Sequence, residues 1–197
     1  MAHLLDVIEI MQTPDRLERA LRLVGSLDHA LGATQRSDRP IIVGGTAIEF
    51  YTLGGYSTKD INLVIADPAP LLDLLREGGF HKEGRHWWRE GFDLVLEIPG
   101  KTLTYAPTAY DRVIEVQVTR EIRTCVIGIE DILTSRLDAG IEERRPNDLG
   151  WAHQMVLLHR DRIDWQALET LAAGNGPRVL AEVQRLRNQG PPPCAAS

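Results

Sequence analysis

Two short stretches of the chain combine residue types that bind phosphate groups and metal ions. The first, Gly44-Gly45-Thr46, follows an apolar run. Glycines at a turn let the backbone approach a ligand closely, and the N–H groups that open a following helix attract phosphate oxygens. The second stretch holds Asp60 and Asn62, which on a strand leave the same face roughly 6.5 Å apart along it. Together the two stretches predict a site for a phosphorylated ligand.

The spacing of residues 60 and 62 also suits metal chemistry. Side chains at this separation can share two ions about 4 Å apart, and magnesium prefers carboxylates together with substrate phosphates. Asn62 offers a neutral carbonyl oxygen, so the pair has one negative charge fewer than two aspartates. Asp93 and Glu97 lie in a later apolar run and share a face at strand period. These residues are the candidates for a metal site.

The order of these motifs resembles the nucleotidyltransferase superfamily that includes DNA polymerase beta. The resemblance is closer to its small prokaryotic members related to abortive-infection and toxin-antitoxin transferases. Their signature is an apolar strand, Gly-Gly or Gly-Ser, a short helix, and a strand that reads Asp-apolar-Asp or Asp-apolar-Glu. Residues 41–47 and 57–63 follow this order, with Asp60 as the first acid. Asn62 departs from the second acid, which weakens the implied metal binding.

The resemblance implies further site residues. A third carboxylate comes from a neighbouring strand in this superfamily, and we expect Asp93, which follows a glycine turn, with Glu97 as the reserve. Asp60, Asn62 and Asp93 are the expected catalytic residues and ligands of Mg²⁺. Residues 126–149 resemble the helical part of the small transferases, where Arg136 replaces a usual lysine that holds triphosphate oxygens. The expected nucleotide-binding residues are Gly44, Gly45, Thr46, Thr58, Lys59 and Arg136.

Each of these features also has an ordinary structural explanation. The glycine pair alone is a common tight turn, and Asp60 alone is a surface acid at a strand edge. Arg136 has acidic neighbours on its helix, which is typical of an ion-paired surface residue. Trp87-Trp88 could stack a base. Because adjacent residues on a strand point to opposite faces, we expect one tryptophan in the core and the other over the hairpin.

The hydrophobic pattern predicts an α/β (α+β) fold, in which a mixed β-sheet with flanking helices precedes a C-terminal helical segment. We expect one nucleotidyltransferase-like domain over 1–189, with a core at about 36–128, helices at about 129–189 and a disordered tail over 190–197. The expected strands are 40–43, 60–66, 80–82, 86–89, 92–98, 113–119 and 122–127. The expected helices are 1–12, 13–32 with Thr13 as N-cap, 46–53, 71–76, and 129–186 with breaks near 146, 161–164 and 174–177.

Composition limits the class of protein. A chain of 197 residues that is 43% hydrophobic can bury one sizeable core. The net charge of −6 argues against a general nucleic-acid binder, which needs an excess of Lys and Arg. The N-terminus lacks a basic leader, so we expect a cytoplasmic protein without a membrane partner. Cys125 and Cys194 show no metal spacing, and Cys125 is expected in the core.

These observations predict a magnesium-dependent transfer of a nucleoside monophosphate from a nucleoside triphosphate to an acceptor hydroxyl. The alternative is a nucleotidyltransferase-fold protein that has lost catalysis and binds a nucleotide or a protein partner. A further possibility is the toxin of a toxin-antitoxin pair, which would modify RNA or protein and would bind an antitoxin. Asn62 is the residue that distinguishes an active transferase from a protein that has lost catalysis, because one missing carboxylate in a three-acid site lowers the rate by orders of magnitude. Nothing in the sequence identifies the acceptor.

Overall fold

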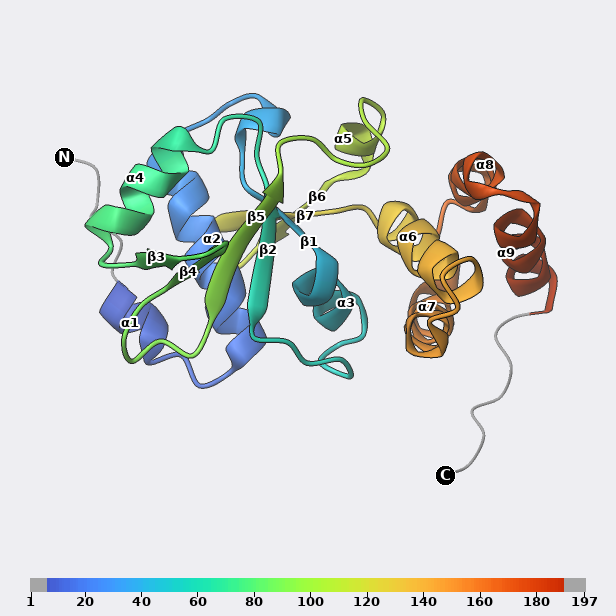
Figure 1. Ribbon diagram of the computed structural model, residues 1–197, viewed down its shortest axis with the longest axis horizontal. Coiled ribbons are helices and arrows are strands. Elements are labelled where there is room, and N and C mark those ends of the chain that lie inside the picture. The colour runs from blue at the N-terminus through green and yellow to red at the C-terminus, as the bar shows by residue number, and fades with distance from the viewer. Residues whose placement is uncertain (1–6, 190–197) are drawn as a thin grey trace.

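The computed structural model describes residues 7–189 of the chain (Figure 1). Residues 1–6 of the expected N-terminal helix, the expected tail 190–197 and Cys194 lie outside the described residues. Within the described part, helices surround one seven-stranded sheet that contains both parallel and antiparallel pairs. This arrangement confirms the expected fold class.

The strand order of the sheet is β3-β4-β5-β2-β1-β7-β6. β2 is parallel to β5 and β1 is parallel to β7, whereas β1 and β2 are antiparallel. The antiparallel pairs β3-β4, β4-β5 and β6-β7 confirm the expected hairpins. The strands are β1 (Ile41–Val43), β2 (Asp60–Val64), β3 (His81–Glu83), β4 (His86–Trp88), β5 (Val95–Gly100), β6 (Ile114–Gln117) and β7 (Arg123–Val126).

The C-terminal helices α6 to α9 gather at one end of the molecule, next to α3 (Figure 1). Their breaks lie where the sequence predicts them. The short helix α5 was not expected from the sequence, because its single turn is too short to show a helical period. The helices are α1 (Val7–Met11), α2 (Arg16–Leu31), α3 (Gly44–Tyr51), α4 (Ala69–Glu77), α5 (Ala109–Arg112), α6 (Ile129–Ile141), α7 (Pro146–His159), α8 (Trp165–Asn175) and α9 (Pro177–Gln189).

Three expected helix starts are wrong, one of them that of α4, which begins at Ala69 and not at Leu71. Helix α2 begins after Asp15 and not at Thr13, because the Asp15 carboxylate accepts the Glu18 N–H at 2.7 Å, which is the N-cap bond. Its expected end is confirmed by Gly32, which has φ 60° and caps the last turn. Helix α3 begins at Gly44 and not at Thr46, so the glycines form its first turn.

The core lies between the sheet and its helices. Alternate residues of the central strands, such as Ile61, Leu63 and Leu96, are fully buried. Trp87 is buried and Trp88 is 38% exposed, which confirms the expected division of this pair. Cys125 is also buried, and burial raises the pKa of its thiol to about 11.

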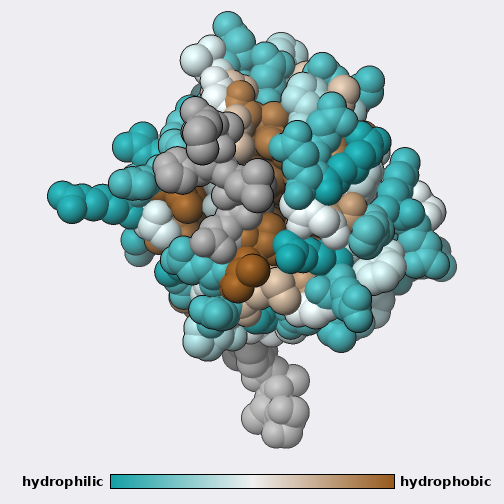
Figure 2. Space-filling view, turned by 90° about the vertical axis from the view of Figure 1, so that its left-hand side faces the viewer, coloured by the Kyte–Doolittle hydropathy of each residue, from teal (hydrophilic) through white to brown (hydrophobic). Residues whose placement is uncertain are grey.

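The side of the molecule away from the C-terminal helices is mostly hydrophilic, with apolar side chains gathered near its centre (Figure 2). None of the described helices is long and apolar enough to cross a membrane.

Candidate active site

One row of polar side chains crosses the sheet. Asn62 on β2 is the register partner of Glu97 on β5, which is the partner of His86 on β4, which in turn pairs with Glu83 on β3. Directly paired residues point to the same face, so these four side chains lie next to one another. Asp60 stands two residues before Asn62 and shares this face. We call Asp60, Asn62, Glu97 and His86 the site row.

The contacts within the site row centre on Glu97. Its Oε2 accepts the Asn62 Nδ2–H at 3.4 Å and lies 3.8 Å from His86 Nε2. Its Oε1 lies 3.4 Å from Arg85 Nε. Glu97 is half-buried, whereas Arg85 and Asp60 are exposed. Glu97 is therefore a carboxylate beside residue 62, but two basic side chains already surround it.

Asp93 lies in a different environment. Strand β5 begins at Val95, so the expectation that Asp93 belongs to this strand is wrong. Its Oδ2 accepts the Arg19 Nη2–H of α2 at 3.0 Å, and the side chain is half exposed. The register of β2 and β5 therefore brings Glu97, the reserve candidate, next to Asn62, while Asp93 pairs with a helix.

The two glycines let α3 begin directly against β2. Gly44 has φ 60°, which favours glycine, and a Cβ there would lie 2.6 Å from Asn62 Oδ1. A Cβ at Gly45 would lie 3.0 Å from Thr58 Cγ2. No side chain caps this helix start, which leaves N–H groups of its first turn for another acceptor. The glycine turn and the site row are therefore in direct contact.

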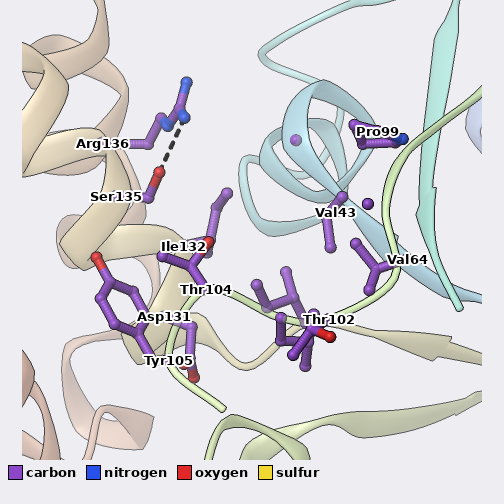
Figure 3. Close-up of a pocket in the computed structure, with 14 residues that line it drawn as sticks. Val43, Val64, Pro99, Thr102, Thr104, Tyr105, Asp131, Ile132, Ser135 and Arg136 are labelled. Atoms are coloured by element: carbon purple, nitrogen blue, oxygen red, sulfur yellow. Dashed lines mark hydrogen bonds between the residues drawn. The ribbon is translucent and has the colours of Figure 1, made fainter. Parts of the chain in front are cut away.

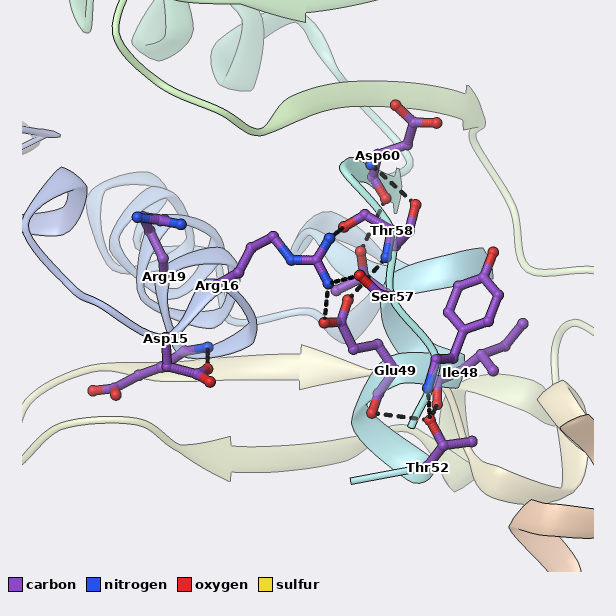
Figure 4. Close-up of polar contacts among 12 residues, drawn as sticks. Asp15, Arg16, Arg19, Ile48, Glu49, Thr52, Ser57, Thr58 and Asp60 are labelled. Carbon is purple, nitrogen blue, oxygen red and sulfur yellow. Dashed lines mark hydrogen bonds and ion pairs between the residues drawn. The ribbon is translucent and has the colours of Figure 1, made fainter. Parts of the chain in front are cut away.

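Two threonines expected to bind nucleotide form hydrogen bonds with the main chain of Asp60. Thr46 is buried, and its hydroxyl donates to the Asp60 carbonyl oxygen at 3.0 Å. Thr58 Oγ1 accepts the Asp60 N–H at 3.1 Å (Figure 4). Lys59, also expected to bind nucleotide, is exposed beside them. The threonine hydroxyls thus fix the start of β2.

A cavity of about 250 Å³ adjoins the glycine turn. Val43 and Val64 form its wall on the sheet side, and α6 forms the opposite wall (Figure 3); Gly44 also lines the cavity. Arg136 lies in the α6 wall, where Nη1 donates to Asp148 Oδ1 at 2.9 Å and Nη2 donates to Ser135 Oγ at 3.0 Å. The structure therefore places two expected nucleotide-binding residues, Gly44 and Arg136, around one cavity.

The other ionisable groups of the cavity carry no unbalanced negative charge. Asp131 is fully buried and accepts two hydrogen bonds of 2.7 Å from Arg112, which raise the pKa of that guanidinium. Tyr105 also lines the cavity, and burial raises the pKa of its phenol, so it stays protonated at neutral pH. Its hydroxyl donates to Asn175 Oδ1 at 3.3 Å. This balance is compatible with an anionic ligand.

The donor set does not fit two metal ions. Among residues 7–189, no three His, Cys, Asp or Glu side chains are grouped closely enough to hold a metal ion. Asp60 and Glu97 supply only two carboxylates to the row, so a hard cation here would need other ligands such as phosphate oxygens. A second ion would face the neutral amide of Asn62 and the Arg85 guanidinium beside Glu97.

The sheet, the glycine turn at the start of α3 and the acid at the start of β2 define a nucleotidyltransferase-type domain. Comparison with protein families agrees with this assignment. Residues 18–189 match the family described as "Nucleotidyltransferase of unknown function (DUF6036)". The chain belongs to this family, and the expected superfamily is confirmed. A search of curated proteins finds no significant match.

Sequence reasoning did not identify Arg85 and His86 as neighbours of the site row. The signal was present in the alternation of 86–88, since a buried Trp87 places His86 on the opposite face. What the sequence could not show is that β4 pairs with β5 in the register that sets His86 against Glu97.

Proposed function

We propose that this chain transfers a nucleoside monophosphate from a nucleoside triphosphate to an acceptor hydroxyl, with release of pyrophosphate. The observation that carries the proposal is the position of Gly44, which contacts Asn62 in the site row and also lines the cavity that contains Arg136. A triphosphate at this turn would have its reacting phosphate near Asp60 and the rest of the nucleotide in the cavity.

Each part of the site has a role in this proposal. The uncapped start of α3 would bind phosphate oxygens through its N–H groups. Arg136 would exchange part of its pairing with Asp148 for a triphosphate oxygen, and exposed Lys59 would add positive charge at the entrance. Asp60, Glu97 and Asn62 would hold one magnesium ion. Its positive charge would stabilise the negative charge that develops on the phosphate during transfer.

The acceptor and the biological context are part of the same proposal. The resemblance to small prokaryotic transferases supports an RNA or protein acceptor in the cytoplasm and, if the chain is a toxin, an antitoxin partner. No contact within residues 7–189 distinguishes these acceptors.

A second candidate function is nucleotide binding without catalysis. The observation in its favour is the engagement of Glu97 by Arg85, His86 and Asn62, which leaves Asp60 as the exposed carboxylate of the row. Such a protein would bind a nucleotide at the glycine turn and act through a partner.

One experiment distinguishes the two functions. The protein is incubated with each α-labelled nucleoside triphosphate, magnesium and total cellular RNA or protein, next to Asp60→Ala as the control. A labelled acceptor that appears with the wild type and not with Asp60→Ala supports transfer. Binding of a triphosphate by the wild type with no labelled acceptor supports the second function, and the absence of both overturns the proposal.

A further inference from the structure

We infer that half-buried Arg16 and buried Glu49 form a clamp that positions Asp60 for the reaction. The inference rests on the proposed function, and neither side chain needs to touch the ligand. Arg16 is the first residue of α2, and Glu49 lies on α3, 33 positions later. Glu49 is only 5% exposed, although it carries a charge.

The clamp contacts Ser57 and Thr58, in the loop before β2. The Arg16 guanidinium donates to a Glu49 carboxylate oxygen, to Ser57 Oγ and to the Thr58 carbonyl oxygen (Figure 4). Glu49 Oε2 also accepts the Thr58 N–H at 3.4 Å. The clamp thus holds both the N–H and the carbonyl group of Thr58.

Thr58 passes this restraint to Asp60. Its Oγ1 accepts the Asp60 N–H at 3.1 Å, and its methyl group lies next to Gly45, where a Cβ would approach it to 3.0 Å. The Asp60 carbonyl oxygen accepts the Thr46 hydroxyl from the first turn of α3. The main chain of Asp60 is therefore hydrogen-bonded to the first turn of α3 directly, through Thr46, and to Glu49 of the same helix through Thr58.

Stability alone is a weak reason for this clamp. Burying an ion pair costs desolvation energy, and apolar side chains of similar volume often give equal or greater stability. Apolar side chains cannot donate to Ser57 and Thr58, however. The hydrogen bonds to the loop are thus the property that only the charged pair provides, and the loop leads directly into Asp60, the exposed carboxylate of the site row.

Substitutions separate positioning from folding. In Glu49→Gln an amide NH2 takes the place of one carboxylate oxygen, so either the Thr58 N–H or Arg16 loses its acceptor. In Arg16→Lys the single ammonium group lacks the planar guanidinium geometry that reaches all three acceptors at once. We expect both variants to lower kcat about 10- to 100-fold, because small displacements of a reacting group have effects of this size, with KM for the triphosphate changed less than about threefold. The matched control is Arg76→Lys, which alters an exposed ion pair with Asp73 on α4.

A double variant keeps the test valid if a single variant unfolds. Arg16→Met with Glu49→Leu replaces the pair by apolar side chains, and we expect near wild-type thermal stability together with the loss of kcat. Wild-type kcat in a folded double variant would overturn the inference, because the clamp would then serve folding only.

Hydrogen exchange tests the clamp without any assay of transfer. The Asp60 amide should exchange at least about tenfold faster in Glu49→Gln than in the wild type, since its acceptor Thr58 is released, whereas Arg76→Lys should leave it unchanged. Unchanged exchange in Glu49→Gln would overturn the clamp. If wild-type protein transfers nothing while the exchange result is as expected, the proposed function fails and the structural coupling stands.

Discussion

Asn62 is the residue at which this chain departs from the acid pattern of its superfamily. Its amide fits the present surroundings, because Nδ2 donates to Glu97 and Oδ1 lies against Gly44. An aspartate could not donate to Glu97, so two carboxylates would face each other at this point. The amide therefore stabilises this arrangement of the site row, but it gives the row one negative charge fewer than an aspartate would.

Asn62→Asp should raise nucleotidyl transfer at least about tenfold, because a carboxylate between two divalent ions offsets their repulsion. Without metal the same variant should have a lower melting temperature, since it loses the hydrogen bond to Glu97 and adds like charge beside it. Magnesium with nucleotide should reverse that loss by binding the folded state. Thermal melts and transfer assays check both effects. Transfer at background and no stabilisation by metal in Asn62→Asp would favour the binding-only function.

Glu97 and Asp93 provide a matched pair of substitutions. Glu97→Gln should lower transfer about 100-fold, because it removes a carboxylate from the site row. Asp93→Asn should leave transfer within about threefold, because Asp93 pairs with Arg19 of α2. The measurement is the initial rate at saturating triphosphate. The opposite ranking of the two variants would restore Asp93 as the third carboxylate.

At the scale of elements, the turn between β1 and α3 brings the site together. Gly44→Ala should destabilise the fold by roughly 1–3 kcal/mol, since alanine resists a positive φ and its Cβ would meet Asn62 Oδ1. The variant should also weaken triphosphate binding. Gly54→Ala is the control, since it also has a positive φ but open space around its Cβ. Equal triphosphate affinity in both variants would argue against a role for the Gly44 turn in binding.

The sequence predicts most elements but not their neighbours. Periodicity identifies β2 and β5, and the glycine pair identifies the turn, because these are local properties. The choice between Asp93 and Glu97 depends on where β5 begins and on its parallel register with β2, which is set by long-range packing. The same is true of Arg16, which is 42 residues from Thr58 and shows no local sign of contact with it.

At the scale of the whole molecule, the C-terminal helices complete the cavity. Helix α6 supplies Arg136, and α7 supplies its partner Asp148. Helix α9 is attached to α7 through Glu182, which lies 2.8 Å from His153 and is also paired with Arg185. The α6 wall of the cavity is therefore joined to α7, which is joined in turn to α9.

The Glu182 contact should be visible in the pH dependence of stability. The hydrogen bond from Arg185, followed by that from His153, lowers the pKa of Glu182 below its usual 4.5. A lowered folded-state pKa adds stability above the unfolded pKa, and this stability is lost as the pH falls through the folded pKa. Glu182→Gln should therefore lose less stability than the wild type below about pH 4.5. Urea unfolding from pH 6 to pH 3 checks this, with Glu143→Gln on an exposed loop as the control, and parallel curves for Glu182→Gln and wild type would contradict it.

Under the proposed function, a triphosphate binds at the Gly44 turn together with a metal held by the site row. Isothermal titration calorimetry with a non-hydrolysable nucleoside triphosphate tests it most directly, in magnesium and in EDTA. We predict one nucleotide per chain with magnesium, at least tenfold weaker binding in EDTA, and the same loss in Asp60→Ala. Equal affinity of the wild type and Asp60→Ala, with or without magnesium, would contradict the claim.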